Sequence, residues 1–256
     1  MFFAVQRTPI TAAALCLALA LAAHPAQAQQ KITVGTTNGV VNGIPFGLSN
    51  TGQPLYAAGN EFQEIYSSTY FQAVSSGPLT ISDIAFASSS SFGFVQPSTA
   101  TYNVTLSLST TKAQVNVNSF KADFAANKGA DFTQVFNGTL TANLQANNTF
   151  DLVFPTAPFT YDPSQGNLLF DLVVNQGASG TGEAEFLTTS GSQTLRAYKS
   201  GATSPTFVDQ FGLYTQFTAI PAAAVPEAST TVSFGLLLAF GAGFAAFKRK
   251  RSGKAA

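Results

Sequence analysis

The alternation of apolar and polar residues is the feature that most limits how this chain can fold. In Thr101–Ser109 every second residue is apolar, and Leu168–Val174 repeats this pattern. A period of two residues is typical of a β-strand that turns one face to a core. Leu169 and Val173 make the second run apolar on its other face as well, which predicts a central strand covered on both sides.

Eight further segments have the composition of strands and are separated by turn-forming residues. In one of them, Leu79–Phe86, the alternation slips by one residue at Ser82-Asp83, which predicts a β-bulge. Asn137-Gly138 and Asp162–Gly166 are expected to be turns, and only Val117–Ala126 is expected to form a short helix. Because there is no βαβ rhythm, the series predicts an all-β fold, an antiparallel β-sandwich of jelly-roll type. The remaining expected strands are Phe62–Ile65, Tyr70–Val74, Gln134–Leu140, Phe150–Phe154, Ala184–Thr188, Thr194–Tyr198 and Phe211–Thr218.

Composition excludes several classes of protein. Apolar residues make up 45% of the chain, which excludes an intrinsically disordered chain, although only 9% of the residues are charged. The 12 Lys and Arg residues are balanced by 12 Asp and Glu residues, which excludes a nucleic-acid binder that relies on a basic face. The single cysteine, Cys16, excludes a disulfide scaffold.

Residues 1–28 have the organisation of a secretory signal peptide. Arg7 supplies the positive charge, Ile10–Ala23 supplies a short apolar core, and Ala26 and Ala28 form the small-x-small pattern that predicts cleavage by signal peptidase before Gln29. Cleavage would remove the only cysteine, histidine and methionine of the chain. The mature protein would then have no cysteine or Ser-His-Asp nucleophile and no His- or Cys-ligated zinc site.

The C-terminal part carries three features in succession. An Ala- and Pro-rich linker, residues 219–225, leads to Val225-Pro226-Glu227, and a wholly uncharged apolar run covers residues 231–247. This run is expected to form a single transmembrane helix within residues 226–251. The basic cluster after it marks the cytoplasmic end, so residues 29–218, the expected passenger domain, lie on the other side of the membrane. The four basic residues are Lys248, Arg249, Lys250 and Arg251.

This order of features, with Gly235–Leu238 at the start of the apolar run, resembles the PEP-CTERM sorting signal of bacterial exported proteins. The resemblance implies processing by exosortase, a membrane-embedded cysteine transpeptidase of Gram-negative bacteria that make exopolysaccharide. It makes Pro226 and Glu227 the recognition dipeptide and the basic cluster the membrane stop. Ala228 departs from the pattern, in which proline is usual. The segment Gly166–Asp171 also resembles a recurrent type of PEP-CTERM passenger, which implies localisation and fold rather than chemistry.

Three hypotheses describe the mature protein. The first is a non-enzymatic, cofactor-free protein of the cell surface or extracellular matrix, associated with exopolysaccharide and biofilm after a transient stay in the inner membrane. The second is a carbohydrate-binding adhesion module that uses exposed tyrosines, with Tyr66 and Tyr70 as candidate glycan contacts. The third is a glycoside hydrolase that uses a pair among Asp151, Asp162 and Asp171.

Ca²⁺ is the metal ion best suited to the oxygen ligands that this chain offers, but no stretch of the sequence has the ligand spacing of an EF-hand.

Overall fold

The computed structural model describes residues 28–89, 98–145, 147–189, 194–199 and 206–222. The expected signal peptide up to Gln27, the sorting residues Val225, Pro226 and Glu227, the apolar run 231–247 and the basic cluster lie outside these residues. Within the described ranges, no helix is long and apolar enough to cross a membrane. The compact unit that contains the described strands ends at Ala222.

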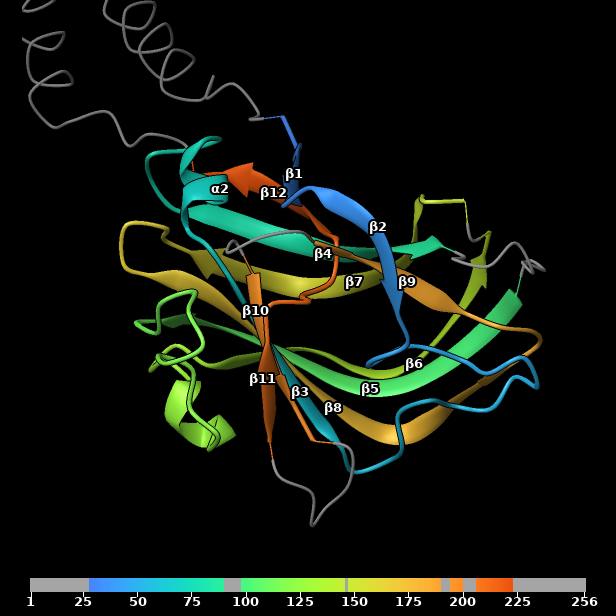
Figure 1. The fold of residues 1–256 in the computed structure, drawn as a ribbon. Helices are drawn as coiled ribbons and strands as arrows, with labels where there is room; N and C mark the ends of the chain where they lie inside the picture. The colour runs from blue at the N-terminus through green and yellow to red at the C-terminus, as the bar shows by residue number, and fades with distance from the viewer. Residues whose placement is uncertain (1–27, 90–97, 146, 190–193, 200–205, 223–256) are drawn as a thin grey trace, which may run out of the picture. The chain divides into compact units, whose positions relative to one another are not determined.

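The fold is an all-β sandwich of two six-stranded sheets, which face each other in Figure 1. Every strand pair is antiparallel. Sheet one has the order β1 (Gln30–Val34), β12 (Thr215–Pro221), β4 (Leu79–Ser89), β9 (Glu185–Thr189) and β2 (Thr37–Asn42), and β7 (Phe150–Tyr161) also pairs with β4. Sheet two has the order β11 (Phe207–Asp209), β10 (Thr194–Tyr198), β3 (Glu61–Tyr66), β8 (Asn167–Gly180), β5 (Ser98–Thr111) and β6 (Thr133–Leu144). Within the described residues there are two short helices, α2 (Thr69–Gln72) and the 3₁₀ turn η1 (Phe124–Asn127).

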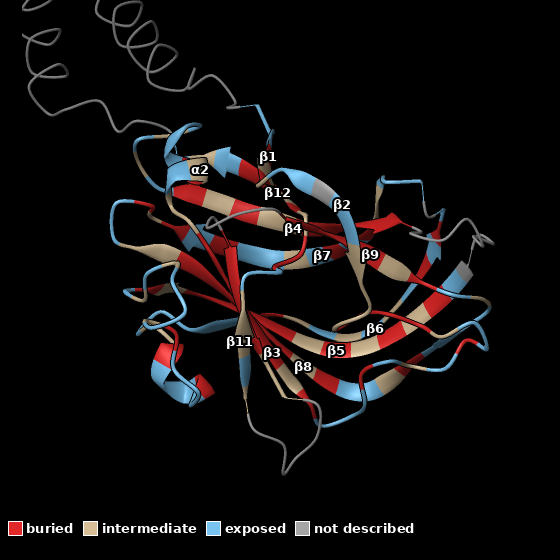
Figure 2. Cartoon of the chain, in the orientation of Figure 1, coloured by how far each residue is buried: buried red, intermediate tan, exposed pale blue. Residues whose placement is uncertain are grey.

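The main core fills the space between the two sheets and contains residues from both. Buried and exposed positions alternate along β6 and β7, whereas β3, β9 and β10 are buried almost throughout (Figure 2). Phe46 lies near the centre of this core, with its ring 4.8 Å from that of Phe86 and 5.6 Å from that of Tyr102. Aromatic pairs at such distances add to the free energy gained by burial.

A second, smaller core lies on the outer face of sheet two. Ile65 and Leu169 of the sheet pack there against Phe120 and Phe124, which belong to residues 112–132, here called the β5–β6 loop. β8 lies between β3 and β5, and Leu169 is fully buried beneath this loop. The prediction of a central strand covered on both sides is therefore confirmed at Leu169.

The predicted β-bulge is confirmed in β4. Asp83 pairs with Thr218 and Ile81 pairs with Ala219, so Ser82 is the extra residue that has no partner in β12. The ladder between β4 and β7 shifts at the same place. The bulge keeps apolar residues on the core side both before and after the slip in the sequence pattern.

Several expectations for single segments are wrong. Tyr70–Val74 is not a strand, because its first part belongs to α2, a single helical turn that buries Phe71 in the main core. Asn137-Gly138 is not a turn, since both residues lie within β6 and pair with β5. In Val117–Ala126 only the end is helical, as the start of η1. Phe211–Thr218 is a strand only from Thr215 onward. The strands β1, β2 and β11 were not expected at all.

Candidate functional site

A groove of about 750 Å³ lies at one end of sheet two. Its walls are the end of β5, the β5–β6 loop and the turn between β7 and β8. Its volume lies within the range of roughly 300–1,000 Å³ that is usual for ligand sites. Charged and hydroxyl side chains line the groove together with alanines and the apolar stems of the lysines, and the polar side chains include Thr110, Lys112, Lys121, Lys128, Asp131 and Asp162.

Three of the six cationic residues between Gln29 and Ala222 line this groove, although that part of the chain carries eleven anionic residues and a net charge of −5. Lys112 and Lys121 are exposed and form no ion pair with any described residue. Lys112 donates a hydrogen bond to the carbonyl of Gln165. The charges of both ammonium groups are therefore available to a ligand in the groove.

The two carboxylates in the groove are instead occupied by donors of the protein. Asp131 accepts hydrogen bonds from the backbone N–H of Thr110 at 2.8 Å and from its hydroxyl at 2.7 Å. Asp162 caps its own turn by accepting the N–H of Ser164 at 2.9 Å. Hydrogen bonds from Ser164 lower the pKa of Asp162, so this carboxyl is unsuited to act as a catalytic acid.

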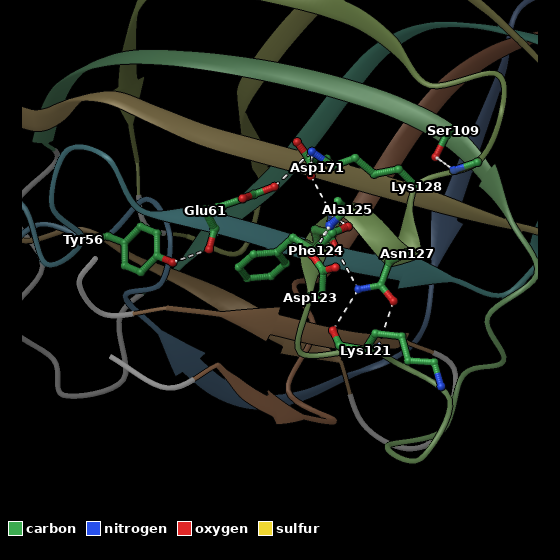
Figure 3. Close-up of polar contacts among 12 residues, drawn as sticks. Tyr56, Glu61, Ser109, Lys121, Asp123, Phe124, Ala125, Asn127, Lys128 and Asp171 are labelled. Carbon is green, nitrogen blue, oxygen red and sulfur yellow. Dashed lines mark hydrogen bonds and ion pairs between the residues drawn. The ribbon is translucent and has the colours of Figure 1, made fainter. Parts of the chain in front are cut away.

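Lys128, which lines the groove, belongs to a cluster of three ionisable side chains with Glu61 and Asp171 (Figure 3). Lys128 Nζ is 3.1 Å from Glu61 Oε1 and 3.2 Å from Asp171 Oδ2. Burial raises the pKa of Glu61, and a hydrogen bond with Asp171 raises it further. Burial would lower the pKa of Lys128, but the charge of Asp171 and a hydrogen bond with Glu61 outweigh this effect and raise it.

Neutral amides hold this cluster and the β5–β6 loop together. Gln63 donates to Asp171 Oδ2 at 2.7 Å and to the carbonyl of Phe124 at 3.0 Å. Asn127 donates to Gln63 Oε1 at 2.9 Å and to the carbonyl of Lys121 at 3.0 Å, and it accepts the N–H of Lys121. The side-chain nitrogen and oxygen of both Gln63 and Asn127 therefore have hydrogen-bond partners. These bonds hold the loop against the sheet.

The structure does not support Tyr66 as a glycan contact. Its side chain is fully buried in the main core, and its hydroxyl is 3.0 Å from that of Thr215. The reason is the register of β3, which directs Phe62, Glu64 and Tyr66 toward the opposite sheet. Tyr70 is half-buried in α2 and packs against the same core. The exposed aromatic rings near the edge of sheet two are Phe207 and Phe211, which the sequence did not single out.

The three candidate catalytic aspartates do not form a pair. Asp151 accepts the hydroxyl of Ser88 at 2.6 Å and the N–H of Gln145 at 2.6 Å, Asp162 caps its turn, and Asp171 is bound by Gln63 and Lys128. The carboxyl group that meets Asp171 is that of Glu61, which no sequence pattern pointed to. Among the described residues, no group of three or more His, Cys, Asp and Glu side chains is placed to hold a metal ion.

Comparison of this chain with models of known protein families and with curated proteins finds no match.

Proposed function

We propose that this chain is a non-enzymatic, exported protein of the cell surface or extracellular matrix, and that its β-sandwich binds acidic polysaccharide in the lysine-lined groove. The observation that carries the binding proposal is that Lys112 and Lys121 form no ion pair with a described residue and lie in the same groove as carboxylates already occupied by the protein's own donors. Hydroxyl and amide groups around them suit a chain rich in hydroxyls and carboxylates. Export is supported by the signal peptide pattern and by the resemblance of residues 226–251 to the PEP-CTERM signal.

We also assign the sandwich to the jelly-roll type. The chain passes between sheet one and sheet two at β2–β3, β3–β4, β4–β5, β6–β7, β7–β8, β8–β9, β9–β10 and β11–β12. Repeated passage between two antiparallel sheets is typical of that arrangement.

Binding can be tested with a linear polyuronate as the probe and a neutral linear glucan as its counterpart. We expect Lys112→Gln with Lys121→Gln to weaken polyuronate binding about tenfold or more, which corresponds to about 1.4 kcal/mol. Binding by the unmodified chain should weaken as salt is added, because exposed charges are screened. Lys31→Gln, a lysine outside the groove, is the control with the same change of side chain. Equal affinity for both polysaccharides, or equal loss in the control, would contradict the proposal.

Sorting can be tested separately from binding. Pro226→Ala with Glu227→Ala is expected to leave the full-length chain uncleaved in the inner-membrane fraction of a host that contains exosortase. Ala228→Pro introduces the proline that usually follows the Pro-Glu dipeptide, and it is expected to speed cleavage by exosortase. Unchanged processing of the double variant would contradict sorting at this dipeptide and would leave the binding proposal untouched.

A further inference from the structure

Three ionisable side chains from three different elements meet beneath the β5–β6 loop, as Figure 3 shows. Glu61 is the first residue of β3, Asp171 lies in β8, and Lys128 follows η1. We propose that Lys128 and Asp171 become joined by an intramolecular isopeptide bond, which the folded protein forms itself with Glu61 as the proton carrier. This modification does not depend on the polysaccharide proposal, in which the ligand is bound by Lys112 and Lys121.

The register of the sheet brings the two carboxyl groups together. Gln63 pairs with Asp171 and Glu61 pairs with Val173, so Glu61 and Asp171 are diagonal neighbours on the outer face. Gln63 then fixes the carboxyl of Asp171 by donating to Oδ2 at 2.7 Å. Lys128 Nζ is 3.2 Å from that same oxygen, so the amine lies directly beside the carboxyl group whose Cγ it would attack.

The surroundings exclude most water from the carboxyl that would react. The side chain of Asp171 is only 3% exposed, whereas those of Lys128 and Glu61 are 26% and 27% exposed. The ring of Phe132 lies 4.5 Å from Lys128 Nζ and covers the amine from one side. Low access of water favours condensation over hydrolysis and reduces the cost of turning the ion pair into neutral groups.

The step is a condensation in which all atoms balance. The Lys128 ammonium group gives up two protons, which Glu61 passes in turn to one oxygen of Asp171, and the nitrogen keeps the third. The nitrogen lone pair attacks Cγ of Asp171, a C–N bond forms, and one C–O bond breaks. The oxygen leaves as water, Glu61 returns to its initial state, and no oxidant or reductant is needed. The raised pKa of Glu61 is consistent with a carboxyl that accepts a proton readily.

The bond would fasten the groove wall to the sheet by a covalent link. Lys128 lies in the β5–β6 loop, and Asp171 lies in the central strand β8. A cross-link between distant residues stabilises a fold by restricting the unfolded chain, as a disulfide does. The chain has one cysteine, Cys16, so it cannot close such a loop by a disulfide within itself.

Mass spectrometry after trypsin digestion of the unmodified full chain tests the proposal directly. Lys121, Lys128 and Arg196 are consecutive trypsin sites, and Asp171 lies between the last two. An unlinked chain gives separate peptides 122–128 and 129–196 with the masses of their sequences. The linked chain gives a single peptide 122–196 that is lighter than its sequence by one water molecule. Recovery of the two separate peptides alone would overturn the proposal.

Variants distinguish an isopeptide bond between Lys128 and Asp171 from an ion pair between the same two residues. Glu61→Gln is expected to abolish the link, and Lys128→Arg should do the same while keeping a cation beside both carboxyl groups. Asp171→Asn is expected to give a peptide 122–196 of the same mass as the linked unmodified chain, because ammonia then leaves in place of water. Lys31→Arg, at a lysine outside both the groove and the cluster, is the control and should remain linked. A link that persists in Glu61→Gln would contradict the role of Glu61.

Discussion

Glu64 is a carboxyl group enclosed in the core between the two sheets. Its side chain is fully buried, Oε2 accepts the N–H of Leu213 at 3.1 Å, and Oε1 has no hydrogen-bond partner among the described residues. Arg196 lies opposite it across the β3–β10 ladder but directs Nε and Nη2 to Asp209, at 2.6 and 3.0 Å. Burial, the largest effect, raises the pKa of Glu64 to about 8.

This raised pKa predicts that stability falls with rising pH. Between the ordinary value of 4.5 and about 8, the folded chain binds more protons at Glu64 than the unfolded chain. The free energy of unfolding therefore decreases through that window and stays level above it. At about 1.4 kcal/mol per pKa unit, Glu64→Gln should be more stable than the unmodified protein by on the order of 5 kcal/mol above pH 8, and by little near pH 4.5.

Urea denaturation over a series of pH values checks this expectation. Glu183→Gln, which removes an exposed carboxyl group, is the matched control and should follow the curve of the unmodified protein. Parallel curves for Glu64→Gln and the unmodified protein would show that Glu64 does not titrate in this way.

At the scale of elements, strands with apolar residues at every second position could be predicted from the sequence, because a period of two residues shows which side chains face the core. β5, β8 and β4 with its bulge at Ser82 are of this kind. Short or polar strands have no such alternating pattern: β11 has three residues, and β2 has the sequence TNGVVN. α2 was mistaken for a strand because aromatic residues favour strands, whereas Phe71 needs only one helical turn to reach the rings of Tyr161 and Phe217.

The candidate site could be predicted only in part. Lys112, Lys121 and Lys128 fall within one connection between strands. This clustering of cations in an acidic domain could have predicted a site for an anionic ligand from the sequence alone. The meeting of Glu61 with Asp171 depends on the register of β3 against β8, which brings together residues far apart in the chain. Local patterns carry no information about such pairing.

The bulge makes a prediction at this scale. Deletion of Ser82 removes the extra residue of β4 and leaves Leu79, Ile81, Ile84 and Phe86 at every second position, so a regular strand keeps all four on the core side. We therefore expect the deletion to cost only about 1–2 kcal/mol in the free energy of unfolding, measured by chemical denaturation. Ser82→Ala keeps the bulge and removes the hydroxyl that donates to Asp83 at 2.9 Å, so it should cost about 1 kcal/mol. A loss of several kcal/mol on deletion would mean that the fold needs the bend of the bulge itself and not only the correct face of each apolar residue.

At the scale of the whole molecule, the first and last strands close the sandwich together. β12 lies between β1 and β4, with Gln30 opposite Ala219, and it ends at Pro221. Cleavage near Pro226 would therefore leave every described strand intact. Within β12, Phe217 is fully buried, and its ring lies 5.0 Å from that of Tyr66 and 5.3 Å from that of Phe71.

This arrangement predicts opposite results for two truncations. A chain of residues 29–222 should have the same thermal midpoint as residues 29–256, because all strands remain. A chain of residues 29–214 lacks β12 and should show no cooperative transition by circular dichroism. The loss of a buried Phe alone costs about 3–5 kcal/mol, against a total stability of about 5–15 kcal/mol for a typical domain. Removing β12 also leaves β1 without its only partner strand and exposes one edge of β4. A lower midpoint for residues 29–222 would instead mean that residues after Ala222 stabilise the sandwich, and processing at Pro226 would then weaken the protein it releases.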